Sequence, residues 1–289
     1  MKKTFLSFGG GVQTTAMLIM IAQGKLQADA VIFADTGSEH PETYEYIEKY
    51  DKPLCVELGI PFITAKMHRS VTVVNMVEKR TWKHPKKKLY PVKGEQIKAD
   101  SLREVLMARR RVPSLQNRWC TEYSKITPIK QVLRSLQSAG EFEKPAICMI
   151  GISIDEKRRA YNKDGTWKQP HHSESRNTYP LVEMGISRDD CHKIIKDFGW
   201  PDPVKSGCYF CPFQGGKEWN KLYWDHPDLF WDSVMLEERD LQFPTYRLYQ
   251  QKPLRRLASG PGFGHGNMTL YDDWEGNLTC GEVEASCFM

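Results

Sequence analysis

A glycine-rich turn close to the N-terminus constrains the fold of this chain more than any other feature of its sequence. A short apolar stretch, Thr4–Phe8, runs directly into Gly9–Gly11, and a helical pattern of apolar residues follows and stops at Gly24. Strand, glycine turn and helix in this order can hold an anion, because glycines let backbone amides converge and the helix N-terminus adds a favourable dipole. The turn matches neither G-x-x-x-x-G-K-[ST] nor G-x-G-x-x-G, which excludes the usual P-loop and dinucleotide motifs.

The same alternation of strand and helix continues along the chain. Apolar stretches at Ala30–Ala34 and Pro61–Met67 predict two further strands, and the residues from Pro41 to about Leu58 predict a helix between them. Later segments predict two helices and one strand, at Thr127–Leu136, Arg188–Phe198 and Ala146–Ile152. This order predicts an α/β fold, a Rossmann-like parallel sheet with helices on both faces.

The positive charge is concentrated in one segment. The chain has a net charge of +5, whereas residues 78–111 contain 12 Lys or Arg and 4 acids, a local balance of +8, so the remainder carries −3. A basic insert on a mildly acidic body indicates an anionic partner such as nucleic acid, although a solvated loop with lysines for solubility fits equally well. The candidate phosphate contacts are Lys86, Lys87, Lys88, Arg109, Arg110 and Arg111.

Composition and cysteine content exclude several classes of protein. With 40% hydrophobic and 27% charged residues the chain is typical of globular proteins. Its longest apolar run, Ala16–Ala22, is far shorter than the roughly 20 residues of a membrane span, and the early glycines do not fit a signal peptide. We therefore expect a cytoplasmic protein with no membrane partner. Eight cysteines are too few for a disulfide scaffold, and the pair Cys208 and Cys211 favours metal or redox chemistry.

Two motifs resemble a known superfamily. The segment SFGGGVQTT at residues 7–15 resembles the PP-loop of ATP pyrophosphatases, and it is similar to the SFG-x-Q version of phosphoadenosine phosphosulfate (PAPS) reductases. The segment VIFADTGSEHPETYEYI at residues 31–47 resembles the PAPS reductase stretch built around DTG and PETY. Two motifs at this separation are much more specific than a glycine turn alone. The resemblance implies an adenine nucleotide α-hydrolase-like fold.

The resemblance also implies a nucleotide site. Its first part is the glycine turn with its neighbours, Ser7, Phe8, Gly9, Gly10, Gly11, Gln13, Thr14 and Thr15. Its second part is the turn Ala34, Asp35 and Thr36 at the carboxyl end of the second strand, with Asp35 as a candidate catalytic residue. Gln13 stands where the usual loop has an acidic or amide residue and follows the reductase branch. The loop therefore leaves open whether the ligand is ATP or a sulfonucleotide.

A further segment resembles the same superfamily in part. GISIDEKRRA at residues 151–160 is similar to G-x-R-x-x-[EQ]-S, with Ser153 in place of the phosphate-binding arginine. The resemblance implies Gly151 and Arg159 as nucleotide contacts. Asp155 or Glu156 are candidates to hold Mg²⁺ through water, and an acid-rich helix start explains them equally well.

Four cysteines form a candidate metal set. RWCTEYSKITPI at residues 118–129 resembles the R-x-C-x-x-x-K-x-x-P stretch of the superfamily, and residues 179–213 resemble its later segment, which ends in a cluster-binding C-x-x-C. The implied ligands are Cys120, Cys191, Cys208 and Cys211. Thiolates suit a [4Fe–4S] cluster, which the resemblance favours, or zinc, and Cys191 also fits a small buried helix residue. Cys55 and Cys148 fit core positions.

Cys280 is a candidate nucleophile. PAPS reductases carry their catalytic cysteine in a C-terminal E-C-G-x-H motif, whereas this chain has L-T-C-G-E-V and ends close to Cys287. Only Cys-Gly is retained, and Glu282 and Glu284 disfavour a thiolate. A structural or persulfide-carrying role is the alternative.

These expectations combine into two regions and one favoured function. Residues 1–215 are expected to form the nucleotide-binding domain, with the basic insert at about 70–115 and the cysteine segment. Residues 216–289 are expected to form a C-terminal region with aromatic-rich helices at 217–249 and a loop-like tail beyond Gly260. The oligomeric state is open, and a homodimer is one option.

The favoured function is an ATP pyrophosphatase that uses ATP and Mg²⁺ to adenylate an acceptor for sulfur incorporation into nucleic acid. This resembles the small PP-loop proteins of DNA phosphorothioation (Dnd and Ssp types), which implies DNA rather than tRNA as the partner and a cysteine desulfurase as the sulfur donor. The alternatives are a sulfonucleotide reductase that forms sulfite, a tRNA thiolation enzyme and a nucleotide-binding scaffold without turnover.

Overall fold

The computed structural model describes residues 3–81, 84–240, 247–249 and 253–258. These residues divide into two compact units. The first contains residues 3–66 and 121–207, and the second contains residues 67–120 and the described residues from 208 to 258. The basic insert lies in the sequence between the two parts of the first unit and is grouped with the segment after the C-x-x-C.

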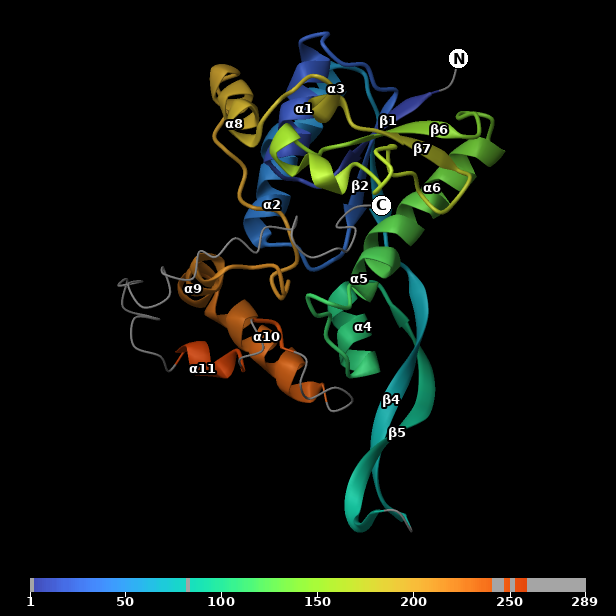
Figure 1. Cartoon of the computed structure of the whole chain (residues 1–289), viewed down its shortest axis with the longest axis vertical. Coiled ribbons are helices and arrows are strands. Elements are labelled where there is room, and N and C mark those ends of the chain that lie inside the picture. The colour runs from blue at the N-terminus through green and yellow to red at the C-terminus, as the bar shows by residue number, and fades with distance from the viewer. Residues whose placement is uncertain (1–2, 82–83, 241–246, 250–252, 259–289) are drawn as a thin grey trace. The chain divides into compact units, whose positions relative to one another are not determined.

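A five-stranded parallel sheet organises the first unit (Figure 1), which confirms the predicted fold class. The strand order is β3-β2-β1-β6-β7, so β1 lies in the centre and the chain turns to opposite sides of it. The strands are β1 (Thr4–Phe8), β2 (Ala30–Asp35), β3 (Phe62–Lys66), β6 (Ala146–Ile150) and β7 (Ser175–Thr178). Ligands of open α/β sheets bind at such a switch point, beyond the carboxyl ends of the strands.

Helices connect these strands as the sequence predicted. The helix expected from Pro41 to about Leu58 is formed by three consecutive helical segments, with a π-helical turn between two α-helical ones. The helical segments of the first unit are α1 (Val12–Ala22), α2 (Pro41–Tyr46), η1 (Ile47–Asp51), α3 (Lys52–Glu57), η2 (Glu122–Ile126), α6 (Thr127–Ser138), η3 (Ile154–Arg159), α7 (Pro180–Glu183) and α8 (Arg188–Asp197). The short helix α5 (Trp119–Thr121) spans the boundary between the units, because the first unit resumes at Thr121.

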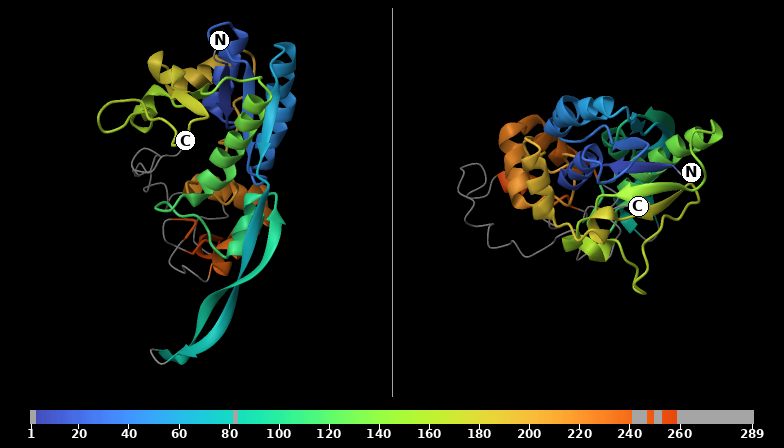
Figure 2. Two further views of the ribbon diagram at one scale, coloured as in Figure 1. Left: turned by 90° about the vertical axis from the view of Figure 1, so that its right-hand side faces the viewer. Right: turned by 90° about the horizontal axis from the view of Figure 1, so that it is seen from above.

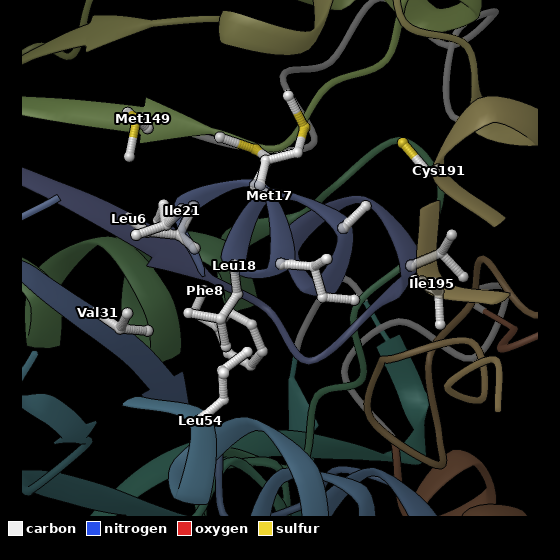
Figure 3. Close-up of a cluster of buried hydrophobic side chains, with 14 of the residues drawn as sticks. Leu6, Phe8, Met17, Leu18, Ile21, Val31, Leu54, Met149, Cys191 and Ile195 are labelled. Carbon is white, nitrogen blue, oxygen red and sulfur yellow. The ribbon is translucent and has the colours of Figure 1, made fainter. Parts of the chain in front are cut away.

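Side chains that alternate along the strands build a core on each face of the sheet. Leu6 and Phe8 of β1 join a cluster with α1 and α8, part of which is drawn in Figure 3. Phe5 points to the opposite face and joins a cluster with Leu133 of α6. This alternation is the period of two that a strand buried on both faces requires.

An antiparallel hairpin and several helices form the second unit. The hairpin pairs β4 (Arg69–Thr81) with β5 (His84–Ala99), and Figure 2 shows its two strands winding around each other. The helices are α4 (Leu102–Arg109), α9 (Gly216–Asp225), α10 (Pro227–Arg239) and α11 (Arg255–Ala258). Asp232 of α10 joins two parts of this unit, because it accepts a bidentate bond from Arg103 of α4 and a 2.7 Å bond from the Tyr209 hydroxyl.

Within the described part of the chain, no helix combines the length and the apolarity that a membrane span requires.

Candidate nucleotide site

The glycine turn is organised by the hydroxyl of Thr14. Its Oγ1 donates to the carbonyl of Gly11 at 3.0 Å and accepts from the amides of Gly9 and Gly11 at 3.4 and 3.3 Å. Both amide contacts are longer than a usual N–H···O hydrogen bond in proteins, which measures about 2.7 to 3.2 Å. These amides therefore remain able to donate to the oxygens of an anion at the start of α1, the arrangement expected from the sequence.

Two glycines of this turn have different reasons to lack a side chain. Gly10 has a φ of +70°, and a Cβ there would lie 2.9 Å from Cγ2 of Thr43 and 3.2 Å from Cδ1 of Ile47. Gly9, in contrast, has open space beside it, because a Cβ on this residue would meet no atom within 4 Å. Gly10 thus lets the turn pack against α2, and the space at Gly9 lets a ligand approach the backbone closely.

Gly151 lies against the first turn of α1. A Cβ on this residue would come within 2.8 Å of Cγ2 and 3.4 Å of the amide nitrogen of Thr14. Since Gly151 directly follows β6, its missing side chain lets the ends of β1 and β6 close around the start of α1. The structure therefore places the predicted residue Gly151 at the site, where it allows close packing.

The turn after β2 is held by the predicted residue Asp35. Its Oδ1 accepts from the amide of Gly37 at 2.8 Å and from the hydroxyl of Tyr44 at 2.7 Å. Burial, and then the carboxyl of Asp35, raises the pKa of Tyr44 far above its ordinary value, so this hydroxyl keeps its proton and donates. Asp35 thus orders the turn, and its catalytic role stays a prediction.

A buried ion pair joins this turn to η2. Glu39 has only 1% of its side chain exposed, and its Oε1 accepts from the hydroxyl of the buried Thr36 at 3.0 Å. Nζ of Lys125 lies 3.8 Å from the same oxygen. Lys125 stands five positions after Cys120, one later than in the R-x-C-x-x-x-K pattern, and was not among the predicted site residues. The resemblance of that stretch to the superfamily could have indicated this lysine. Its partner Glu39, 86 positions earlier, is found only from the fold.

Gln13 and Arg159 meet through Glu156. Nε2 of Gln13 donates to Oε2 of Glu156 at 3.4 Å, and Nη1 of Arg159 donates to Oε1 at 2.6 Å. The structure therefore brings two predicted nucleotide contacts to one place. Asp155 accepts from the amide of Arg188 at 2.6 Å. Both acids suggested for Mg²⁺ are thus engaged by protein donors, so we expect Mg²⁺ to arrive bound to the phosphates of the nucleotide.

Three predicted contacts have side chains buried inside the first unit, which leaves their backbone atoms to contact a nucleotide. Phe8 is buried in the core, and Thr15 and Thr36 have no exposed surface, so their side chains cannot reach a ligand. The Thr15 hydroxyl lies on the core side of α1, next to the carboxyl of Asp51. These side chains pack beneath the two turns, inside the first unit. Ser7 is half-buried in β1, and Ala34 is buried in β2, so Ala34 is restricted to backbone contacts.

The four cysteines of the candidate metal set fall into both units. Cys120, Cys208 and Cys211 belong to the second unit, in which the amide of Cys211 donates to the carbonyl of Cys208 at 2.9 Å and closes a tight turn. Cys191 belongs to the first unit and is fully buried on α8, in the apolar cluster with Met17 and Ile195 (Figure 3). Burial, and then the charge of Asp190, raises the pKa of Cys191 to about 12, which opposes the thiolate that a metal needs.

The surroundings of these four cysteines differ among the described residues. Among them, no group of three or more His, Cys, Asp or Glu is arranged to hold a metal ion. The cluster and zinc remain predictions that involve Cys120, Cys208 and Cys211, and Cys191 has the surroundings of a core residue. Cys55 and Cys148 are buried in α3 and β6, as expected.

Metal content tests this division of the cysteines. Replacement of Cys208 and Cys211 by serine is expected to remove iron or zinc from anaerobically purified protein, because each change removes a thiolate ligand. Cys191→Ala is the matched control and is expected to lower the melting temperature while it leaves the metal content unchanged. Loss of metal from Cys191→Ala with an unchanged melting temperature would restore Cys191 as a ligand.

The candidate phosphate contacts of the basic insert differ in their surroundings. Arg109, Arg110 and Arg111 are half-buried at the end of α4, and the guanidinium of Arg109 lies 4.9 Å from the ring centre of Trp119. Lys86, Lys87 and Lys88 belong to β5, and their side chains lie outside the described residues. Cys280 and Cys287 also lie outside the described residues.

Comparisons with known proteins place this site in a family. Residues 3–185 match the phosphoadenosine phosphosulfate reductase domain. An uncharacterized protein of Methanocaldococcus jannaschii is 20% identical over 246 residues, which are 82% of this chain and 42% of that protein. The chain thus spans about two fifths of the length of this curated relative.

A solved structure also resembles the chain at low similarity. The U34-tRNA thiolase NcsA from Methanococcus maripaludis with its [4Fe–4S] cluster has a TM-score of 0.37 and 12% identity, over 85% of this chain and 73% of that chain. The family match carries the assignment. Its residues 3–185 include the glycine turn, the DTG turn and the segment of Arg159 and make up more than half of the sequence. The chain therefore belongs to the phosphoadenosine phosphosulfate reductase domain family.

Proposed function

We propose that this chain is an ATP pyrophosphatase that adenylates an acceptor for sulfur incorporation into nucleic acid, in the manner of DNA phosphorothioation. The observation that carries the proposal is the glycine turn, in which two backbone amides converge at the start of α1 beside the hydroxyl of Thr14. A site of backbone donors suits the pyrophosphate part of ATP, which leaves with its negative charge during adenylation.

The proposed reaction proceeds in two displacements. An oxygen of the acceptor attacks the α-phosphorus of ATP, the bond to the β-phosphate breaks, and its electron pair leaves with pyrophosphate. Sulfur at the oxidation level of sulfide then attacks the activated acceptor, and AMP leaves with the oxygen. The amides of Gly9 and Gly11 would stabilise the charge that grows on the pyrophosphate, and Mg²⁺ bound to ATP would share it. A cysteine desulfurase is the proposed source of the sulfur. It supplies a persulfide, and a thiol reductant then attacks the inner sulfur, releases the outer one as sulfide and remains as a disulfide.

The side chains of Lys125 and Arg159 are positively charged and are suited to neighbouring parts of the nucleotide. Lys125 is held beside the DTG turn by Glu39, with a quarter of its side chain exposed, and Arg159 is held near Gln13 by Glu156. Fixed cations lose little conformational entropy when a phosphate binds, which makes their contribution to affinity larger. We propose that both orient the triphosphate, with Arg159 nearer the glycine turn.

Nucleic acid is the proposed acceptor because of the hairpin of β4 and β5. Residues 69–99 contain nine Lys or Arg and two acids, and the described residues Lys79, Lys93 and Lys98 are exposed. Lysines on an exposed two-stranded ribbon can follow a phosphate backbone, whereas a small sulfonucleotide would need few of them. DNA is the proposed polymer and tRNA the alternative.

Charge removal on the hairpin tests this part of the proposal. A variant with Lys79, Lys93 and Lys98 changed to glutamine is expected to bind duplex DNA more weakly. Its plot of log affinity against log salt should be shallower by about 3, since each lost phosphate contact removes about 0.9. The control changes three exposed lysines of the first unit, Lys25, Lys193 and Lys196, and should keep the original slope. Equal slopes in all three proteins would mean that the hairpin lysines are solvated and do not contact DNA.

Nucleotide selectivity tests the proposal against its main alternative, a sulfonucleotide reductase. Calorimetric titration with ATP and with adenylyl sulfate should give the tighter binding for ATP, because the glycine turn then engages all of the pyrophosphate. Thr14→Val is expected to weaken ATP binding about tenfold or more through loss of the hydroxyl that orders the turn. Tighter binding of adenylyl sulfate would favour the reductase instead.

A further inference from the structure

The residues that precede the C-x-x-C lie against the nucleotide turn inside the first unit. Oγ of Ser206 is 2.7 Å from the position that a Cβ on Gly11 would take. The next residue, Gly207, accepts a 3.3 Å hydrogen bond at its carbonyl from the amide of His40. Gly11 and His40 are the residues at which α1 and α2 begin. Ser206 and Gly207 therefore contact both halves of the candidate site.

The absence of a side chain on Gly11 leaves room for the Ser206 hydroxyl. Gly11 has φ −112° and ψ 174°, an extended conformation that any residue can adopt. Backbone strain thus gives no reason for a glycine at this position. The close approach of the Ser206 oxygen gives such a reason, because the methyl group of an alanine at position 11 would occupy the same space. The chain therefore keeps a hydroxyl group at the start of α1, where the amides of the turn converge.

A serine hydroxyl at this place can serve a bound phosphate. It rotates freely, so it can donate one hydrogen bond to a phosphate oxygen while the amides of Gly9 and Gly11 donate others. It carries no charge and adds a second hydroxyl donor to that of Thr14, which comes from α1 itself. A hydrogen bond to a charged group contributes more to affinity than one between neutral groups.

We propose that Ser206 is a phosphate ligand of the nucleotide site and binds the pyrophosphate part of the nucleotide. This inference rests on the proposed function, since it needs a nucleotide phosphate at the glycine turn. It adds a residue from a segment far along the chain, 195 positions after Gly11, which neither sequence motif of the nucleotide site includes. Ser206 is thereby a determinant of selectivity for nucleotides with a diphosphate or triphosphate group.

Titration of three probes tests the proposal. Ser206→Ala is expected to weaken the binding of ATP and of inorganic pyrophosphate about tenfold and to leave the binding of adenosine unchanged. The matched control, Ser135→Ala, removes a hydroxyl from an exposed position on α6 and should bind all three probes as the unmodified protein does. Melting temperatures of both variants verify that the fold is retained.

A double-mutant cycle provides a second and independent test. Gly11→Ala is expected to weaken ATP binding, because its methyl group displaces the Ser206 hydroxyl. In the Ser206→Ala background the same change should cost much less, since the distance to Cβ of Ser206 is 3.5 Å, an ordinary contact. Additive losses in the cycle would show that the two positions act separately and would contradict the proposal.

The remaining outcomes are also decisive. If Thr14→Val weakens ATP binding and Ser206→Ala does not, the nucleotide turn stands and Ser206 is not a ligand. If Ser206→Ala weakens adenosine as much as ATP, its role is structural and the proposal is wrong. If the unmodified protein binds neither ATP nor pyrophosphate, both the inference and the proposed function fail.

Discussion

Gly10→Ala is expected to destabilise the first unit by about 2 to 5 kcal/mol and to reduce ATP binding below detection. Part of the loss, about 1 to 2 kcal/mol, comes from the φ of +70°, which an L residue adopts only with strain. The rest comes from the contact of the new methyl group with Thr43 at 2.9 Å, an overpacking that typically costs about 1 to 3 kcal/mol. Either α2 or the glycine turn must move, and a shifted turn no longer presents its amides to a phosphate.

Gly24→Ala provides a control for the strain alone. Gly24 has nearly the same φ, +71°, but a Cβ there would meet no atom within 4 Å. It lies beyond the end of α1, away from the turn. We expect this variant to lose about 1 to 2 kcal/mol in urea denaturation and to bind ATP normally. Equal losses in the two variants would show that the contact with α2 contributes nothing.

Asp51→Asn is expected to stabilise the protein by about 1 to 3 kcal/mol at neutral pH, because folding must protonate the buried carboxyl of Asp51 whereas asparagine is already neutral. Asp51 has no exposed surface, and neither of its carboxyl oxygens has a hydrogen-bond partner of ordinary geometry among the described residues. The groups around it are the hydroxyls of Thr15 and Tyr46 and the thiol of Cys55. Asparagine has almost the same shape and is neutral at every pH.

The pH dependence follows from the raised pKa of Asp51. Burial raises this pKa well above its ordinary value, so the folded protein keeps the proton at a pH where the unfolded chain has lost it. The contribution of Asp51 to stability is therefore fully present below the unfolded pKa of about 3.9 and is lost as the pH rises. We expect the advantage of Asp51→Asn to grow from about pH 4 toward neutrality.

Urea denaturation between pH 4 and 8 measures this difference. The control, Asp197→Asn, changes an exposed carboxyl on α8 and should alter stability by less than about 0.5 kcal/mol at any pH. A constant difference between Asp51→Asn and the unmodified protein would contradict a buried carboxyl with a raised pKa. A destabilised variant at neutral pH would mean that Asp51 has a strong partner in the folded protein.

The parallel sheet and the nucleotide turn could be predicted from the sequence because their signals are local. Thr4–Phe8 and Ala30–Ala34 are continuous apolar runs, and both are followed by turn residues that end a buried strand. The position of Cys191 also had a local signal, since Ile195 stands four residues later on the same face of a helix. This spacing favours the core position that the structure shows.

Other features depend on contacts between distant segments. The pairing of Glu39 with Lys125 and the approach of Ser206 to Gly11 follow from the order of the strands, and no local pattern encodes either contact. Thr14 and Thr15 are both buried, but the hydroxyl of Thr15 lies beside Asp51 of η1 whereas that of Thr14 contacts the glycine turn. No local pattern separates the two roles.

The hairpin of β4 and β5 gave no strand signal for a different reason. Only short stretches such as Ser70–Val73 alternate polar and apolar residues, and the run of lysines at 86–88 resembles a solvated loop.

Pyrophosphate release from ATP and Mg²⁺, with and without DNA or tRNA, tests the proposed function most directly. We predict release that duplex DNA stimulates, with a stoichiometric amount of AMP when a sulfide donor is present, and loss of both products in Thr14→Val. Stimulation by tRNA in place of DNA would change the acceptor and keep the chemistry. Absence of pyrophosphate, together with sulfite formed from a sulfonucleotide, would contradict the account and make the protein a reductase.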